Sequence, residues 1–167
     1  KGVALHRLGG QKLQLSVTVE WGITANDEAA LCRALGMELV ITDHHECKSE
    51  LPEAVAVVDP HRLDQPQPAS ELAGVGVAFK LACAIGGDTA SLLREYCDFL
   101  CLRPVADAMP LTGENRTPVA GGLKSLAHPK RVGLAALTAA GGVRHGRLTA
   151  RPTAHTPAPP PPAPRRP

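Results

Sequence analysis

Acidic and imidazole side chains follow three short apolar segments of the chain, and side chains of these types bind divalent metals. Glu20 ends the first segment, residues 43–46 read Asp-His-His-Glu after the second, and residues 59–61 read Asp-Pro-His after the third. Carboxylates combined with imidazoles suit Mn²⁺, Fe²⁺ or Zn²⁺. Carboxylate-rich sites in clefts commonly hold two ions, which stabilise the attacking and leaving oxygens of a phosphoryl group. The pattern therefore indicates metal-assisted phosphoryl chemistry.

The three segments are predicted to be strands of one parallel sheet. Residues 13–20 alternate apolar and polar side chains, which is typical of a strand. Residues 39–42 and 55–58 are short apolar runs, which are typical of strands buried on both faces. In a parallel sheet, ligand-binding groups gather in the crevice beyond the carboxyl ends of the strands. The acidic and imidazole side chains stand at those ends.

A helix predicted over 26–35 sets the direction of the first two strands. Thr24 is placed to cap its first turn and Gly36 to end it. Strand, helix and strand within about 30 residues form a βαβ unit, so we expect both strands to be parallel and inside the sheet. Neighbouring strands lie roughly 5 Å apart, so Glu20 and residues 43–45 can converge on one small volume. The alternative is a pair of solvated histidines beside an aspartate that caps a strand; the position after a buried strand favours ligand binding.

The rest of the chain is predicted to be helical and then disordered. Helices are expected at 73–85, 90–102, 119–126 and 132–140, with a loop at 104–113. Residues 151–167 carry eight of the 16 prolines and are expected to sample polyproline II. The predicted fold class is therefore α/β, a parallel βαβ-built sheet followed by a helical segment and a disordered C-terminal tail. The expected division is a domain at 1–142, with its sheet part at about 10–60 and its helical part at about 72–142, and a tail at 143–167.

Charge and composition exclude several classes of protein. All 16 acidic residues lie at or before Glu114, with nine Lys and Arg, whereas nine Lys and Arg and no acid follow. The acidic first part argues against a surface that coats DNA broadly, and 2% aromatic residues exclude a platform of stacked aromatic rings. No run approaches the roughly 20 apolar residues of a membrane helix, and no signal peptide is visible. Five cysteines without a CxxC pair predict a reduced, cytoplasmic chain.

Four segments together resemble a known family. Residues 40–46, Val-Ile-Thr-Asp-His-His-Glu, look like the signature of the DHH phosphoesterase superfamily. Within it, residues 18–25, 72–80 and 105–116 resemble the RecJ-like exonucleases specific for single strands, and they occur in the expected order over about 10–142. The segment 72–80, Leu-Ala-Gly-Val-Gly-Val-Ala-Phe-Lys, favours this group over the smaller DHH phosphodiesterases.

The resemblance implies a metal site. It would use His44, with Asp43 and His45 beside it, and Asp107 as a further carboxylate ligand. Glu20 falls where the family has an aspartate, and its additional methylene moves the carboxylate by about 1.5 Å. The implied cofactor is Mn²⁺ or Mg²⁺, with two ions in the intact parent protein. Asp43 is assigned to the ligands and to catalysis, and His45 is predicted to contact the scissile phosphate or to assist proton transfer.

Cationic side chains near the predicted site are expected to contact the phosphates of a substrate. These are His61, Arg62, Lys80 and Arg116. For Lys80, a solvated charge is an equal alternative. The glycines at 74 and 76 could cradle a phosphate at a helix N-terminus, but close packing of helix on sheet is favoured because the segment has neither a GxGxxG motif nor a Walker lysine.

The function implied by the resemblance is 5′→3′ hydrolysis of single-stranded DNA in recombination and repair, with single-stranded DNA as the partner. RecJ-like proteins carry an Asp-rich motif before the matching region and a DHHA1 domain after it. We therefore expect this chain to be a fragment of such an exonuclease, impaired on its own. Two alternatives stay open: a smaller DHH phosphodiesterase acting on oligonucleotides or cyclic dinucleotides, and a non-catalytic remnant of the fold.

Overall fold

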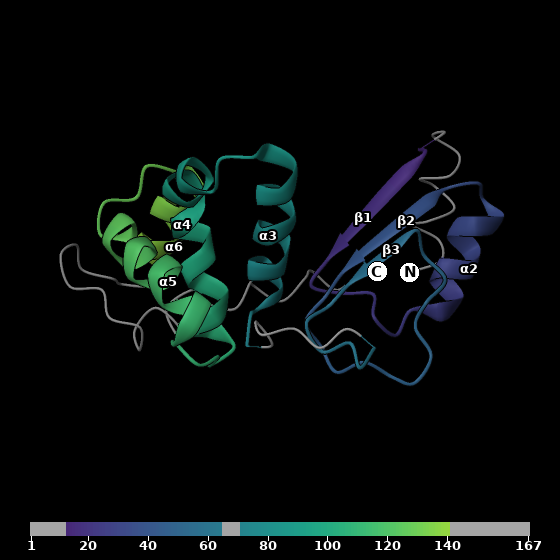
Figure 1. The fold of residues 1–167 in the computed structure, drawn as a ribbon. Helices are drawn as coiled ribbons and strands as arrows, with labels where there is room; N and C mark the ends of the chain where they lie inside the picture. The colour runs from purple at the N-terminus through teal and green to yellow at the C-terminus, as the bar shows by residue number, and fades with distance from the viewer. Residues whose placement is uncertain (1–12, 65–70, 141–167) are drawn as a thin grey trace, which may run out of the picture. The chain divides into compact units, whose positions relative to one another are not determined.

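The computed structural model describes residues 13–64 and 71–140, which divide into two compact units with their boundary between Ile85 and Gly86. The predicted α/β class, a parallel sheet followed by helices, is confirmed (Figure 1). The tail predicted at 143–167 lies outside the described residues. Among the described helices, none combines the length and apolarity needed to cross a bilayer.

The first unit is built on three parallel strands, β1 (Leu15–Val19), β2 (Glu38–Thr42) and β3 (Ala56–Val58), in the order β1-β2-β3. Val40 of β2 pairs with Val17 on one side and Ala56 on the other. The predicted parallel pairing is therefore correct. The prediction that both opening strands lie inside the sheet is wrong for β1, which is an edge strand of the three described, and its apolar side chains stay about half exposed.

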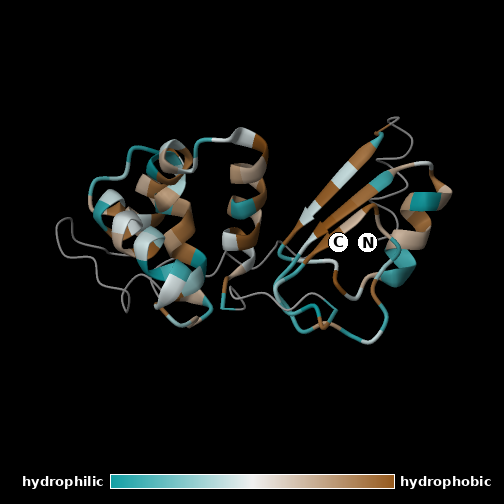
Figure 2. Ribbon diagram, in the orientation of Figure 1, coloured by the Kyte–Doolittle hydropathy of each residue, from teal (hydrophilic) through white to brown (hydrophobic). Residues whose placement is uncertain are grey.

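Helix α2 (Asn26–Ala34) packs on the sheet and forms the core of this unit. Ala29 and Cys32 of the helix lie against Leu39 and Ile41 of β2, and all four are buried. In Figure 2, β1 and β2 are coloured largely brown, which marks hydrophobic residues. The N-cap is Ala25 and makes no side-chain hydrogen bond, so the prediction of Thr24 as cap is wrong by one residue.

The turn at Gly36 and one further helix belong to the first unit as well. Gly36 follows α2 at a φ of +72°, the left-handed conformation that ends many helices, as predicted. Helix α3 (Gly74–Gly86) follows the buried residues Leu72 and Ala73, and it agrees with the helix predicted at 73–85.

The second unit consists of α4 (Thr89–Ala106), α5 (Gly113–Leu126) and α6 (Val132–Ala140). The loop predicted at 104–113 is shorter, because α4 continues through Pro104 and α5 begins six residues before the predicted start and includes Pro118. A proline inside a helix removes one hydrogen bond and crowds the preceding turn. Pro104 is buried among the helices, and that burial offsets the cost.

Helices α4 and α5 approach each other closely at Gly122, where α5 meets Cys97 and Cys101 of α4. A Cβ added at Gly122 would lie 2.1 Å from the carbonyl oxygen of Cys97 and 2.5 Å from Cβ of Cys101. A Cβ at the neighbouring Gly121 would lie 3.7 Å from Cβ of Cys97, which is an ordinary contact. The two helices can therefore approach this closely only because residue 122 has no side chain.

We expect Gly122→Ala to destabilise the helical unit by roughly 3 kcal/mol, because the methyl group meets backbone that cannot move aside without separating the helices. Gly121→Ala is the matched control and should leave stability unchanged or slightly higher, since alanine favours a helix. Urea unfolding followed by circular dichroism at 222 nm measures both. Equal stabilities for the two variants would contradict the close approach at Gly122.

Candidate active site

An acidic residue follows each strand directly at the carboxyl edge of the sheet. Glu20 follows β1, Asp43 follows β2 and Asp59 follows β3. The amide of Asp43 donates to the carbonyl oxygen of Val58 at 3.1 Å, which extends the pairing of β2 and β3 into the turns. The parallel topology therefore gathers three carboxylates and the neighbouring histidines at one edge, as the sequence predicts.

Asp43 organises this edge from a buried position, with 1% of its surface exposed. Its Oδ2 accepts the amide of Ile23 at 2.9 Å, and its Oδ1 accepts the amides of His44 at 2.8 Å and His45 at 3.3 Å. Burial alone would raise the pKa of this carboxyl. The hydrogen bonds from Ile23, from the ring of His45 and from the two histidine amides outweigh burial, so the pKa is lowered and the group is held as a carboxylate.

His45 is an exposed imidazole oriented by that carboxylate. Its Nδ1 lies 2.6 Å from Oδ1 of Asp43, and 58% of its side chain is exposed. Because a carboxylate only accepts, Nδ1 carries the proton and donates it. In a neutral imidazole the other ring nitrogen, Nε2, is then the acceptor, an arrangement that suits proton transfer to or from a substrate.

His44 and Glu20 form a second pair, which is suited to a metal. Only 9% of the His44 side chain is exposed, and its Nε2 is buried with no hydrogen-bond partner. That nitrogen lies 3.9 Å from Oε2 of Glu20. A buried imidazole nitrogen without a partner is costly unless something binds it, and a carboxylate beside it completes a donor set that fits a divalent cation.

Asp59 and His61 were not assigned a shared role by the sequence, although both follow β3. The prediction that this strand is buried on both faces is wrong, because its residues are exposed or half-buried. Asp59 is 3% exposed, and its Oδ1 accepts the amide of His61 at 2.8 Å and lies 3.5 Å from Nδ1 of that ring. Oδ2 of Asp59 and Nδ1 of His61 are buried without hydrogen-bond partners. Burial, together with repulsion from Asp43, raises the pKa of Asp59 against the opposing hydrogen bond from His61. The edge therefore holds two buried carboxyls, of which Asp43 has a lowered pKa and Asp59 a raised pKa.

The remaining residues predicted to contact a substrate belong to different elements of the chain. The guanidinium of Arg62 is engaged by the carbonyl oxygen of Val57 at 2.6 Å and by the carboxylate of Asp64. Lys80 is exposed on α3, and Arg116 is exposed on α5 of the second unit. Their contacts with a substrate stay a prediction.

Asp107, which the resemblance implies as a metal ligand, belongs to the second unit. It is the C-cap of α4, and its Oδ2 lies 3.3 Å from Nε of Arg103. Its side chain is 27% exposed. Its part in a metal site also stays a prediction.

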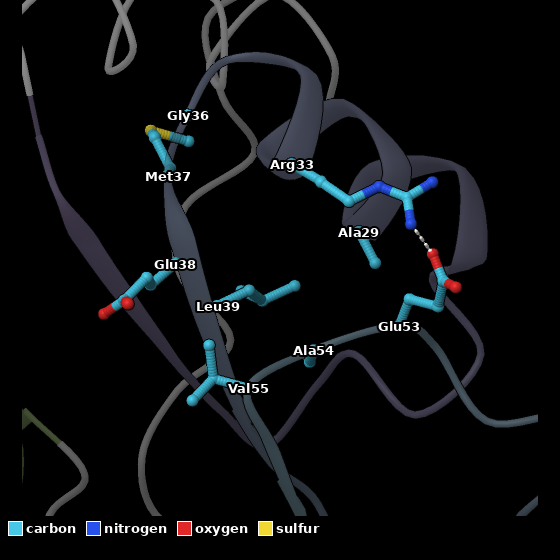
Figure 3. Close-up of a pocket in the computed structure, with 9 residues that line it drawn as sticks. All are labelled: Ala29, Arg33, Gly36, Met37, Glu38, Leu39, Glu53, Ala54 and Val55. Atoms are coloured by element: carbon cyan, nitrogen blue, oxygen red, sulfur yellow. Dashed lines mark hydrogen bonds and ion pairs between the residues drawn. The ribbon is translucent and has the colours of Figure 1, made fainter.

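A cavity of about 530 Å³ lies at the opposite end of β2 from Asp43 (Figure 3). Its lining is mainly apolar, with Met37, Leu39 and Val55 among its residues. Arg33 and Glu53 point toward each other and form an ion pair. The cavity is thus lined by none of the residues considered for chemistry.

Comparison with known proteins shows the family of this chain. A family model described as "DHH family, N-terminal domain" matches residues 3–102. The chain belongs to the DHH family.

The similar curated proteins are RecJ exonucleases, so the RecJ-like resemblance is confirmed. The chain is 41% identical over 131 residues to the single-stranded-DNA-specific exonuclease RecJ of Bacillus subtilis, covering 78% of this chain and 16% of that protein. It is 36% identical over 137 residues to RecJ of Salmonella typhimurium, covering 74% of this chain and 24% of that protein. The chain therefore spans a quarter or less of the length of these relatives.

Two solved structures share the fold. RecJ from Thermus thermophilus in complex with Mn²⁺ matches with a TM-score of 0.75 at 29% identity, covering 93% of this chain and 23% of that one. An exonuclease RecJ bound to manganese matches with a TM-score of 0.70 at 29% identity, covering 90% of this chain and 38% of that one.

The opposite pKa directions of Asp43 and Asp59 predict opposite responses to the same substitution. At pH 7, Asp43→Asn should lower the free energy of unfolding by about 2–3 kcal/mol, because the fold stabilises the ionised form and the amide cannot accept every bond. Asp59→Asn should change it by less than about 1 kcal/mol or raise it, because the fold disfavours the ionised form there.

Fluorescence of Trp21, the single tryptophan, follows unfolding of the first unit in urea, with a chelator present. Asp59→Asn serves as the matched control, since both carboxyls are buried at the same edge. A larger loss for Asp59→Asn than for Asp43→Asn would refute the assignment.

Proposed function

We propose that this edge of the sheet is the catalytic site of a metal-dependent phosphodiesterase that hydrolyses single-stranded DNA, as a 5′→3′ exonuclease of the RecJ type. The observation that carries the proposal is the buried Nε2 of His44, which has no hydrogen-bond partner and faces a carboxylate oxygen of Glu20. The names of the relatives, which are exonucleases specific for single-stranded DNA, support the substrate.

The residues present would hold Mn²⁺ or Mg²⁺ through His44 and Glu20, and two ions are proposed. When bound, such ions supply Lewis-acid stabilisation of charge on the phosphate and lower the pKa of water. The two solved relatives contain manganese, which supports that metal. Asp107 is proposed as a further ligand, on the resemblance of its segment to the family.

The chain's own groups handle the proton. Water adds its oxygen to phosphorus and the bond to the leaving oxygen breaks, so one proton must leave the nucleophile and one must reach the leaving group. His45 presents Nε2 for this transfer, while Asp43 holds Nδ1 and fixes the ring. Both carboxylate oxygens of Asp43 accept hydrogen bonds. We therefore propose that Asp43 positions the turn, in addition to its predicted role as a metal ligand. His61, Arg62, Lys80 and Arg116 are proposed to contact the strand.

The proposed setting is recombination and repair of DNA in the cytoplasm. We also propose that hydrolysis by this chain is slower than hydrolysis by the Bacillus subtilis relative. The support for this is Glu20, which stands where the resemblance to the family implies an aspartate. Side-by-side assays on one 5′-phosphorylated oligonucleotide compare the rates, and equal rates would contradict the proposal.

We expect His44→Asn to weaken Mn²⁺ binding on the order of a hundredfold, because it removes a metal-facing imidazole. His45→Asn should leave Mn²⁺ affinity within about twofold but slow hydrolysis by roughly a hundredfold, because it removes a proton carrier. Isothermal titration calorimetry measures the affinity, and release of nucleotides from 5′-phosphorylated single-stranded DNA measures hydrolysis.

The two adjacent histidines control for each other, since each variant has the same change of side chain. A chelator should abolish hydrolysis, and duplex DNA and a cyclic dinucleotide should be poor substrates. Faster hydrolysis of the cyclic dinucleotide would favour the smaller phosphodiesterases instead. Absence of Mn²⁺ binding by the unmodified chain would overturn the proposed metal site.

A further inference from the structure

Glu20 occupies a backbone conformation that few non-glycine residues adopt. Its φ is +64°, in the left-handed region, where an L side chain is strained. This conformation directly follows β1 and determines where the side chain begins. The surroundings of its carboxylate must therefore stabilise it.

Those surroundings are the first residues of α3. A Cβ added at Gly74 would lie 2.7 Å from Cγ of Glu20, 2.9 Å from Cδ and 3.1 Å from Cα. The first two distances are shorter than those of real Cβ atoms, and the third, to the backbone, is unusually short. The side chain of Glu20 thus crosses directly over Gly74, and only a glycine there leaves it room.

The amide of the next residue fixes one oxygen of the carboxylate. Val75 donates its N–H to Oε1 of Glu20 at 3.0 Å, across 55 residues of sequence. Helix α3 has no acidic residue in its own first turn. An anionic acceptor at a helix N-terminus makes a charge-assisted hydrogen bond and interacts favourably with the helix dipole. Glu20 therefore supplies to α3 the capping charge that its local sequence lacks.

With Oε1 held by Val75, the other oxygen is the one that faces His44. Oε2 lies 3.9 Å from the buried Nε2 of that histidine. We propose that the N-terminus of α3 is the positioning element of the site: Gly74 admits the Glu20 side chain and Val75 fixes its Oε1, so that Oε2 alone is presented beside His44. The contacts with α3 stand by themselves, whereas their effect on metal binding rests on the proposed function.

Two consequences follow for this chain. Glu20 offers a bound cation one oxygen instead of two, because the other is committed to the helix. The metal affinity also depends on Gly74 and Val75, although neither side chain would touch the metal. Both are therefore positioning residues.

The first test compares two pairs of variants of the full chain without metal. Hydrogen exchange of the Val75 amide, measured by NMR after chelation, reports the bond to Glu20. Gly74→Ala and Glu20→Ala should each reduce its protection by about tenfold, because the acceptor is displaced or removed. Gly76→Ala is the matched control, since its added Cβ would meet only the side chain of Leu72, at 3.0 Å. Glu20→Gln should retain the protection, because its amide oxygen still accepts.

The second test titrates Mn²⁺ alone into the same variants by calorimetry. We expect Gly74→Ala and Glu20→Gln to weaken binding by about tenfold or more, and Gly76→Ala by less than about twofold. Glu20→Ala and Glu20→Gln add no atoms against Gly74, so they remain informative if Gly74→Ala fails to fold.

The outcomes separate the two proposals. Unchanged protection of Val75 in both Gly74→Ala and Glu20→Ala would overturn the inference about α3, whatever the metal does. Lost protection in these variants with Mn²⁺ affinity unchanged in Glu20→Gln would support the capping of α3 and overturn Glu20 as a metal ligand. Equal Mn²⁺ affinities of Gly74→Ala and Gly76→Ala, with Glu20→Gln weakened, would overturn positioning by Gly74.

Discussion

The buried carboxylate of Asp43 is the interaction on which the carboxyl edge of the sheet depends. It joins the turn after β1, through the amide of Ile23, to the turn after β2, through the amides of His44 and His45. Hydrogen bonds to one buried charge offset the cost of desolvating it, and in a low dielectric they are strong. Both imidazoles follow this anchor directly in the chain. The charge on Asp43 therefore holds the backbone of both histidines and the ring of His45.

Much of the first unit could be predicted because its signals are local. Alternation in 13–20, the apolar run at 39–42 and a helix between them are enough to predict parallel strands and a shared edge for the residues that follow them. The exposure of β1 could not be predicted, because alternation does not reveal how many strands flank it. The predicted helix ends were also wrong where tertiary packing outweighs the local preference of a residue. Pro104 lies inside α4, although it lacks a backbone donor, and it is buried there.

The sequence was enough to predict which residues gather at the site. It was not enough to predict the different roles of these residues. A loop after a buried strand allows two adjacent histidines to face one region, and this was the expectation for residues 44 and 45. Their difference in burial, 9% against 58% of the side chain exposed, arises from tertiary packing. That difference gives His44 a nitrogen suited to a metal and His45 one open to substrate. The sequence placed Asp59 at a strand end, but its raised pKa depends on burial and on Asp43.

Position 20 shows how one methylene group can change the connections of a site. From sequence, the glutamate is a departure that moves a ligand by about 1.5 Å, and Gly74 is a packing residue. In the structure these are one feature, because the longer side chain passes over Gly74 and reaches the amide of Val75 while its second oxygen stays 3.9 Å from His44. A shorter carboxylate on the same backbone could not hold both positions. The contact joins residues 55 apart, so no local pattern could have predicted it.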